Sequence, residues 1–406
     1  MAVAVVYGAG NIGRGFIGML FAQSGYSVTF IDVDKGMVDA INERGRYPVR
    51  VLPDGGAGLT WVENVRAIDG ADVAAASRAI ASADIMASAV GARALQVIAP
   101  VIAEGIRLRL SETGRPLDIL ICENLAAANQ KLAAWLSEGA AGLPEKTVRA
   151  SVGLVETAIA RMIPVQDSAL NDGDPLMVSA EAYAFLPVDR DAFVGEMPDI
   201  EGLIPLDNFE RYISRKLYVH NMGHAVCAYF GLLTGDEYIF EAVRRSDIRY
   251  AAQSAMTESA RALFSEYGMP LDALLGHIED LIKRFANTAL TYSCARAGAD
   301  TARKLSGSDR FIGAARLCRR NSVPSAFIEV GAAAALMIHM RESEGRDSAD
   351  AAEQALRNIS GLSLTSDDDN HIVKGIMKYY RMLEDGAGAD ALSFAALDDA
   401  ACKSVI

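Results

Sequence analysis

The chain of 406 residues lacks the features that mark several classes of protein. It has no run of about 18 uninterrupted apolar residues, which argues against a membrane-spanning helix. Basic residues are in deficit, with 39 Lys and Arg against 52 Asp and Glu, and the net charge is −13. This balance argues against a broad surface for nucleic acid or acidic membranes, although it allows a small basic pocket for one anionic ligand.

Cysteine is also scarce, and the five cysteines show no CxxC motif and no close pairing. We therefore expect reduced thiols in a cytoplasmic protein rather than a disulfide framework or a zinc knuckle. The apolar N-terminus, MAVAVVYGAG, lacks the basic segment of a signal peptide and soon meets glycines. We expect no targeting segment there.

The first third of the chain alternates short β-branched runs with amphipathic segments. Strands are expected at 3–7, 27–33, 83–90 and 117–124, and a helix at 11–25. This alternation predicts an α/β Rossmann domain with a doubly wound, mostly parallel sheet. A further strand near the edge of this region is expected at 175–189.

Prolines and glycines punctuate the chain between about 187 and 207, and beyond them strand patterns nearly vanish. We therefore predict two domains, an NAD-binding Rossmann domain over 1–195 and a mainly α-helical substrate and catalytic domain over 196–406. Helices are expected at 208–235, 239–266, 270–285 and 323–343. The acidic run SDDDNH (366–371) is typical of a solvated loop or a helix start.

A G-x-G-x-x-G motif follows the first predicted strand and opens the first predicted helix, with glycines at Gly8, Gly10 and Gly13. In a dinucleotide-binding site these glycines permit the tight turn, the approach of the pyrophosphate and close helix packing. Asp32 ends the next strand, 22 residues after Gly10, and would accept hydrogen bonds from ribose hydroxyls. Its charge favours NAD over NADP. The alternative to a dinucleotide-binding site is a glycine-rich turn that binds no ligand.

Other residues extend this predicted cofactor site. They are Ala9, Asn11, Ile12 and Arg14 in the loop, Val90 and Gly91 at the end of the third strand, and Asn124 at the end of the fourth. Ligands of doubly wound sheets collect at the carboxyl ends of the strands, where all of these positions fall. Arg14 is compatible with contact to a pyrophosphate or a substrate anion, and equally with a solvated side chain.

The stretch RKLYVHNMGHAVCAYF (215–230) carries polar residues inside an otherwise apolar helix pattern. On an α-helix Asn221 lies about 140° around from Lys216, and His224 about 80°, so all three can face one cleft. An alcohol dehydrogenase needs a base for the hydroxyl proton and donors for the developing oxyanion. Lys216 is the candidate base, with Asn221 and His224 as the donors, although a solvated lysine and a core histidine are the common alternatives.

His220 and His224 also have the i, i+4 spacing of metal ligands. HNMGH lacks the glutamate of H-E-x-x-H, and no third ligand follows at a familiar interval. We therefore predict no metal site.

Cations cluster within 284–313 of this acidic chain, among them Arg296, Arg303, Lys304 and Arg310. Such a group is suited to a phosphate or carboxylate. Equally, these cations are suited to pairing with carboxylates of the protein itself.

Taken together, GAGNIGRGFIG, K-x4-N-x2-H (Lys216, Asn221, His224) and RKLSGSDR (303–310) resemble the polyol-specific long-chain dehydrogenases, over nearly the whole chain. The length and the RKLSGSDR motif resemble the shorter branch, which acts on phosphates. The resemblance implies a zinc-independent NAD enzyme that interconverts mannitol 1-phosphate and fructose 6-phosphate, with Lys216 as general base. It also implies substrate contacts at Asn287, Arg296, Arg303 and Lys304, a monomer or small homo-oligomer, and no nucleic-acid or membrane partner.

The chain departs from the pattern of this family at four positions, Ala160, Thr288, Ser293 and Ala299, where the family has Asp, Pro, Asp and Arg. These departures suggest a related enzyme with a changed substrate, such as another sugar-alcohol phosphate. Two alternatives remain open, a dehydrogenase of an unphosphorylated polyol or sugar acid, and an NAD-binding paralogue without catalysis.

Overall fold

The computed structural model describes residues 1–52, 58–125, 127–138, 142–164, 166, 170–342 and 348–385. The chain divides into two compact units, Met1–Phe209 and Glu210–Ile406. The junction falls after the one expected at 195/196. The reason is that strand β11 (Leu203–Leu206) pairs with β10 (Leu186–Asp189), which keeps the intervening segment in the first unit.

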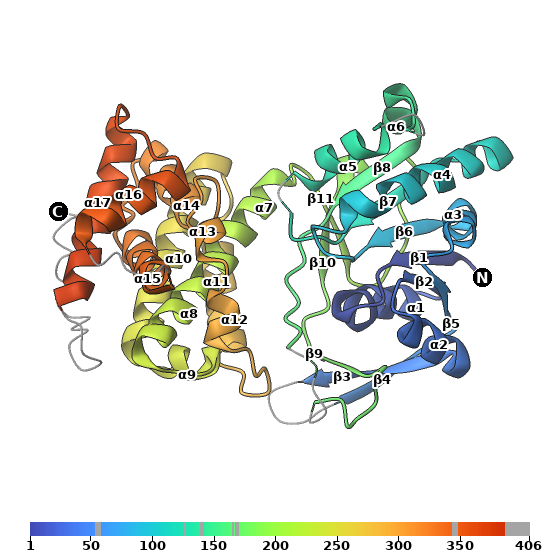
Figure 1. The fold of residues 1–406 in the computed structure, drawn as a ribbon, viewed down its shortest axis with the longest axis horizontal. Helices are drawn as coiled ribbons and strands as arrows, with labels where there is room; N and C mark the ends of the chain where they lie inside the picture. The colour runs from blue at the N-terminus through green and yellow to red at the C-terminus, as the bar shows by residue number, and fades with distance from the viewer. Residues whose placement is uncertain are drawn as a thin grey trace. The chain divides into compact units, whose positions relative to one another are not determined.

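The first unit is built on a six-stranded parallel sheet (Figure 1). Its strands are β1 (Val3–Tyr7), β2 (Ser27–Asp32), β5 (Val65–Asp69), β6 (Ile85–Ser88), β7 (Leu117–Ile121) and β8 (Val152–Glu156). They lie in the order β5-β2-β1-β6-β7-β8, so the strand order reverses between β1 and β6. This confirms the predicted doubly wound sheet, and β5 and β8 are strands that the sequence patterns did not indicate.

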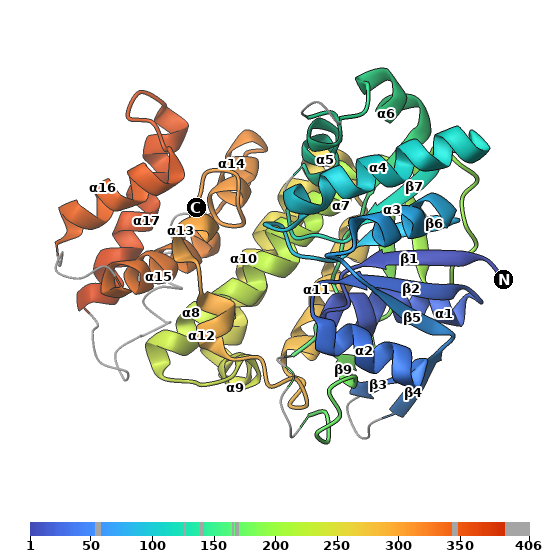
Figure 2. The same ribbon diagram turned by 45° about the vertical axis from the view of Figure 1, so that its right-hand side comes forward.

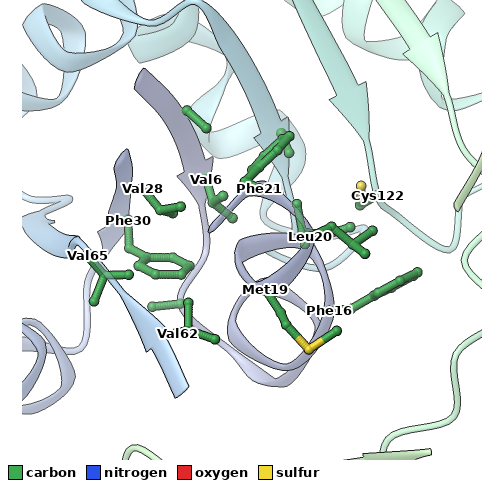
Figure 3. Packing of buried hydrophobic residues seen from close by; sticks show 14 of the residues in the cluster. Val6, Phe16, Met19, Leu20, Phe21, Val28, Phe30, Val62, Val65 and Cys122 are labelled. Carbon is green, nitrogen blue, oxygen red and sulfur yellow. The ribbon is translucent and has the colours of Figure 1, made fainter. Parts of the chain in front are cut away.

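Both faces of this sheet are covered, as the alternation of buried side chains along β1 shows. Ala4 and Val6 pack with η1 (Gly13–Gly18), a π-helical segment, and α1 (Met19–Gln23); Figure 3 shows side chains of this core. Val5 and Tyr7 face α3 (Val73–Ser82), α4 (Leu95–Thr113) and α5 (Ala128–Leu136) on the other side (Figure 2). Burial on both faces explains why the strands are apolar runs rather than alternating ones.

A second, three-stranded sheet joins segments that are distant in the sequence. After α2 (Lys35–Arg44), β3 (Arg46–Leu52) pairs antiparallel with β4 (Gly58–Glu63) and parallel with β9 (Val178–Glu181). The single strand predicted over 175–189 is therefore wrong. Its first part is β9, whereas its second part is β10, which pairs with β11 in a different sheet. A short helix, α6 (Glu145–Ser151), precedes β8.

The second unit is helical, as predicted. Its elements are α7 (Glu210–Arg215), η3 (Lys216–Asn221), α8 (Met222–Thr234), α9 (Ile239–Arg244), α10 (Ser246–Tyr267), α11 (Leu271–Phe285), α12 (Cys294–Gly298), α13 (Thr301–Lys304), α14 (Ile312–Arg320), α15 (Ala326–Glu342), α16 (Ala349–Ser360) and α17 (Asp367–Asp385). Helix α8 packs against α10, α12 and α15. The acidic run at 366–371 starts α17, where carboxylates complement the helix N-terminus. No helix among the described residues is both long and apolar enough to cross a bilayer.

Candidate functional site

The three glycines of the G-x-G-x-x-G loop have different surroundings. Gly8 has φ +104°, and a Cβ built on it would lie 2.3 Å from the Ala89 carbonyl oxygen. A Cβ on Gly13 would lie 1.9 Å from the Gly8 carbonyl oxygen. Around Gly10, by contrast, no heavy atom of the described residues beyond its two chain neighbours lies within 4 Å of that position. The fold itself thus requires Gly8 and Gly13, whereas Gly10 borders open space that suits the pyrophosphate of a dinucleotide.

Asp32 ends β2 and lies directly beside this loop. Its Oδ2 accepts the backbone N–H of Ala9 at 2.6 Å, and its Oδ1 accepts that of Asp34 at 3.0 Å. The carboxylate is half-buried, so it keeps a solvent-facing side. Asn11 and Ile12, at the start of the following helix, are also half-buried. An acidic group beside an open glycine turn fits the ribose and pyrophosphate of a dinucleotide.

Arg14 is neither solvated nor on the open side of the loop. Its side chain is buried, Nε donates to the Ala9 carbonyl at 2.6 Å, and Nη1 donates to the Leu176 carbonyl at 2.5 Å. Burial lowers the pKa of the guanidinium. Arg14 thus ties the glycine loop to the segment that leads into β9. Contact with a cofactor, which the sequence suggested, stays a prediction.

A second buried arginine, Arg161, contacts η1, the segment that contains Arg14. Two side chains donate to backbone carbonyls within the π-helical segment η1. Arg161 Nη1 donates to the Gly15 carbonyl at 3.0 Å, and the Tyr47 hydroxyl donates to the Arg14 carbonyl at 2.9 Å. Burial lowers the pKa of Arg161 to about 10, so it stays a cation at neutral pH. The sequence did not indicate this role.

The remaining predicted cofactor residues follow β6 and β7. Val90 is half-buried, Gly91 is exposed with φ +88°, and Asn124 is exposed just beyond β7. Glu123 lies beside Asn124 but is buried, and burial raises the pKa of its carboxyl. Since parallel strands end at one edge, the predicted cofactor residues other than Arg14 lie at or just after the carboxyl edge of β1, β2, β6 and β7.

In the second unit, Lys216 and Asn221 are the first and last residues of the π-helical segment η3. Residues five apart lie about 140° apart on an α-helix, but a π turn places them one above the other, because its hydrogen bonds join residues i and i+5. The angle expected from a regular helix is therefore wrong. The wide turn brings the lysine and the asparagine closer to one face, and both side chains are half-buried.

His224 lies between two aromatic rings, with centroid distances of 5.2 Å to Phe285 and 5.2 Å to Tyr292. Burial, together with the positive charges of Arg310 and Lys304, lowers the pKa of His224 to about 3. The imidazole is thus neutral throughout the ordinary pH range and can donate one N–H. Arg310 also donates from Nη1 to the Asn221 carbonyl at 3.3 Å, so it supports the end of η3.

His220 is buried within η3, with its ring 5.8 Å from that of Phe285. Its Nδ1 has no hydrogen-bond partner among the described residues. Burial, reinforced by Arg284, lowers the pKa of His220 well below its usual value. Across the described ranges, no group of three His, Cys, Asp or Glu is arranged to hold a metal ion.

The predicted substrate residues differ in what they contact. Lys304 is buried and donates from Nζ to the carbonyls of Ala297 and Ala299, at 2.7 Å for the first. Arg303 pairs with Asp300 at 2.6 Å and with Asp309 at 3.3 Å. These two cations therefore have partners within the protein.

Arg296 and Asn287 are linked to the surroundings of His224 through aromatic residues. Arg296 is exposed, and its guanidinium lies 5.3 Å from the centre of the Tyr292 ring, which is the ring that packs against His224. Asn287 is buried, follows Phe285 closely, and accepts the N–H of Ala289 at 2.9 Å. The sequence patterns missed the two aromatic residues, although both flank Asn287 in RFANTALTYS.

One departure from the family pattern has a local explanation. Ser293 caps α12, and its Oγ accepts the backbone N–H of Arg296 at 3.2 Å. Serine and aspartate are interchangeable as helix caps, so the serine can do here what an aspartate would do. Thr288 and Ala299 are exposed.

Both units match family models of known proteins. The family model of the mannitol dehydrogenase Rossmann domain matches residues 2–202, and that of the mannitol dehydrogenase C-terminal domain matches residues 208–390. A mannitol-1-phosphate 5-dehydrogenase of Brevibacillus brevis is 36% identical over 366 residues, covering 89% of this chain and 94% of that protein. One of Thermoanaerobacter pseudethanolicus is 34% identical over 391 residues, covering 95% and 99%.

Solved structures share the fold at lower identity. Pseudomonas fluorescens mannitol 2-dehydrogenase, in a ternary complex with NAD and D-mannitol, has a TM-score of 0.79 at 14% identity, over 99% of this chain and 94% of that one. A substrate-free D-sorbitol dehydrogenase has a TM-score of 0.77 at 17% identity, over 96% and 94%. Since the two family models together span both units, the chain belongs to the mannitol dehydrogenase family of polyol oxidoreductases.

Proposed function

We propose that the protein is an NAD-dependent, zinc-independent dehydrogenase that interconverts a sugar-alcohol phosphate and a ketose phosphate. The substrate pair is mannitol 1-phosphate and fructose 6-phosphate, or a close analogue. The observation that carries this proposal is similarity over nearly the whole length to two mannitol-1-phosphate 5-dehydrogenases. The π-helical placement of Lys216 and Asn221 supports the assignment of the chemistry.

NAD, when bound, supplies the acceptor for the hydride of the alcohol carbon. Asp32 holds the adenosine ribose, and the half-buried start of the helix after Gly10 faces the pyrophosphate. The carboxylate of Asp32 is unfavourable for the additional phosphate of NADP, which accounts for the cofactor preference.

Lys216 removes the hydroxyl proton of the polyol at its Nζ, which must be the neutral amine when the reaction begins. The amide of Asn221 and the N–H of neutral His224 donate to the substrate oxygen as it gains negative charge. A neutral imidazole suits this task because it donates without giving up its proton to the alkoxide. Arg310 maintains the geometry through its hydrogen bond to the Asn221 carbonyl.

The test is NADH oxidation with a panel of ketose phosphates, free ketoses and keto-sugar acids, with and without a chelator. Wild-type protein should turn over a ketose phosphate, and the chelator should not change the rate. Lys216→Ala should lower kcat by about 10²–10⁴, and an added primary amine should restore part of the activity. Lys283→Ala is the matched control, since Lys283 is exposed on α11. Full activity of Lys216→Ala would refute the mechanism, and no turnover on any substrate would refute the function.

A dehydrogenase of an unphosphorylated polyol is the second candidate, because the observed partners of Arg303 and Lys304 favour it. Cations already paired within the protein are less suited to a substrate phosphate. Comparing kcat/KM for mannitol 1-phosphate and mannitol separates the two candidates. If a phosphate is bound, Arg296→Gln should raise KM for the phosphorylated substrate only, and Arg303→Gln, its matched control, should change KM less.

A further inference from the structure

The buried carboxylate of Glu123 holds the segment that follows β6. Its Oε1 accepts the backbone N–H of Val90 at 2.9 Å, and its Oε2 accepts that of Gly91 at 2.8 Å. The side chain is only 6% exposed, although Glu123 comes directly after β7 at the open edge of the sheet. A buried carboxylate is unfavourable unless its hydrogen bonds repay the loss of water, which two backbone donors do here.

These hydrogen bonds limit what the segment can offer a ligand. The N–H of Ala89 donates to the Tyr7 carbonyl at 2.7 Å, and those of Val90 and Gly91 donate to Glu123. Three consecutive N–H groups are therefore used within the protein. Of the three carbonyl oxygens, that of Gly91 accepts the N–H groups of Ala94 and Leu95, at 3.0 and 3.3 Å, and that of Ala89 lies against Gly8. The carbonyl oxygen left for a ligand is that of Val90, which accepts hydrogen bonds and repels phosphate.

The segment lies at the point where a dinucleotide crosses the sheet. Ala89 lies against Gly8, as the 2.3 Å approach of a built Cβ shows, and β1 and β6 flank the reversal of strand order (Figure 1). Asp32 takes the adenosine ribose on the β2 side, and Gly10 takes the pyrophosphate. The part of the dinucleotide that remains for the β6 side is the nicotinamide riboside. Its ribose hydroxyls and its carboxamide are hydrogen-bond donors.

We propose that Glu123 is a positioning residue that holds residues 89–91 with the Val90 carbonyl towards the nicotinamide riboside half of the cofactor. It acts through the backbone of Val90 and Gly91, without contacting the cofactor itself. This inference rests on the proposed use of NAD. It adds that the two halves of the cofactor meet different backbone groups, N–H donors at the glycine loop and a carbonyl acceptor after β6.

The test compares binding of NADH with binding of ADP, which lacks the nicotinamide half, by isothermal titration calorimetry. Glu123→Gln keeps the size of the side chain but turns an amide N–H₂ towards a backbone N–H, so one of the two hydrogen bonds becomes a repulsion. We expect the Kd for NADH to rise at least tenfold and the Kd for ADP to change less than twofold. Glu123→Asp, which keeps both oxygens on a shorter arm, should lose less affinity for NADH.

Glu156→Gln is the matched control. Glu156 ends β8 at the same edge, and its carboxyl accepts the backbone N–H groups of Ala128 and Asn129 at the start of α5, away from residues 89–91. It should leave the ratio of the two Kd values unchanged. Unchanged NADH affinity in Glu123→Gln, equal weakening of both ligands, or the same NADH-specific loss in Glu156→Gln would overturn the proposal. If Glu123→Gln does not fold, Glu123→Asp is judged by the same ratio. Failure of wild-type protein to bind either ligand would instead refute the use of NAD.

Discussion

Two alanine substitutions, three residues apart, test the glycine loop most directly. At Gly13 the new Cβ would lie 1.9 Å from the Gly8 carbonyl oxygen, although Cβ atoms essentially never come within 3.0 Å of a neighbour. The loop or the helix must therefore move by more than 1 Å. At Gly10 the Cβ meets no heavy atom of the described residues within 4 Å beyond its two chain neighbours. The same chemical change should thus damage the fold at one position and only the proposed binding site at the other.

The expected changes in Tm and in the Kd for NADH follow from these contacts. Overpacking of this kind costs about 1–3 kcal/mol, and for a domain of about 200 residues each kcal/mol lowers Tm by about 2–4 °C. Gly13→Ala should therefore lower Tm by roughly 2–12 °C. Gly10→Ala should leave Tm equal or slightly higher, because alanine restricts the unfolded chain. Its methyl group occupies the space proposed for the pyrophosphate, so the Kd for NADH should rise at least about tenfold, or about 1.4 kcal/mol.

Differential scanning fluorimetry and NADH fluorescence titration on both variants provide the measurements. Gly10→Ala with wild-type affinity for NADH would show that the pyrophosphate does not lie against Gly10. A large loss of Tm in Gly10→Ala would contradict the open space around it. Normal stability of Gly13→Ala would refute the close approach to Gly8.

Three further outcomes are expected. Asp32→Ser removes the charge unfavourable to NADP, so the ratio of kcat/KM for NAD to that for NADP should fall at least about tenfold, and an unchanged ratio would contradict the role of Asp32. His224→Asn should lower kcat by about 10². It should not shift any apparent pKa of the rate between pH 5 and 9, because the pKa of His224 is about 3. Loss of an ionisation from the pH–rate profile of the variant would show that His224 titrates in that range. Burial raises the pKa of Glu258 from 4.5 to about 8. Between these pH values the folded state keeps a proton that the unfolded state loses. The free energy of unfolding therefore declines as pH rises from 4.5 through 8. In urea unfolding at pH 5.5–7.5, the stability of wild-type protein relative to Glu258→Gln should fall by about 1.4 kcal/mol per pH unit, and parallel curves would refute this.

Local patterns were sufficient for the main features of the fold. Strands buried on both faces are apolar runs, and those at β1, β2, β6 and β7 were recognisable beside helices and glycines. The antiparallel pair of β3 and β4 was not, because Pro48 interrupts the pattern of β3 and β4 is largely exposed. The split of 175–189 depends on pairing with β3 and β11, which are distant in sequence. Such pairing leaves no signal within the segment itself.

At the candidate site, residue types and spacing selected Asp32, Lys216 and Asn221. Asp32 lies beside the glycine loop, and Lys216 and Asn221 begin and end η3, while their roles stay predictions. Arg14 was ambiguous because nothing in its sequence neighbourhood indicates carbonyl partners at residue 176. The π turn was also invisible, since sequence periodicity assumes a regular helix. Burial and long-range acceptors determine these features, and only the folded chain shows them.

The π-helical segment η3 has a consequence for insertions and deletions. A π turn accommodates one more residue than an α turn over the same hydrogen-bonded length, so removing one residue between Lys216 and Asn221 would allow an unbroken α-helix from α7 to α8. Such a deletion would satisfy the backbone as well as before, and α8 could keep its packing. The relative orientation of Lys216 and His224 would also change little, because four steps of an α-helix and five steps of a π turn both return the chain to about the same face. Removing one residue between Asn221 and His224, outside the π turn, would instead turn His224 by about 100° relative to Lys216. The place at which the extra residue is accommodated is therefore as much a part of the site as the identities of these side chains.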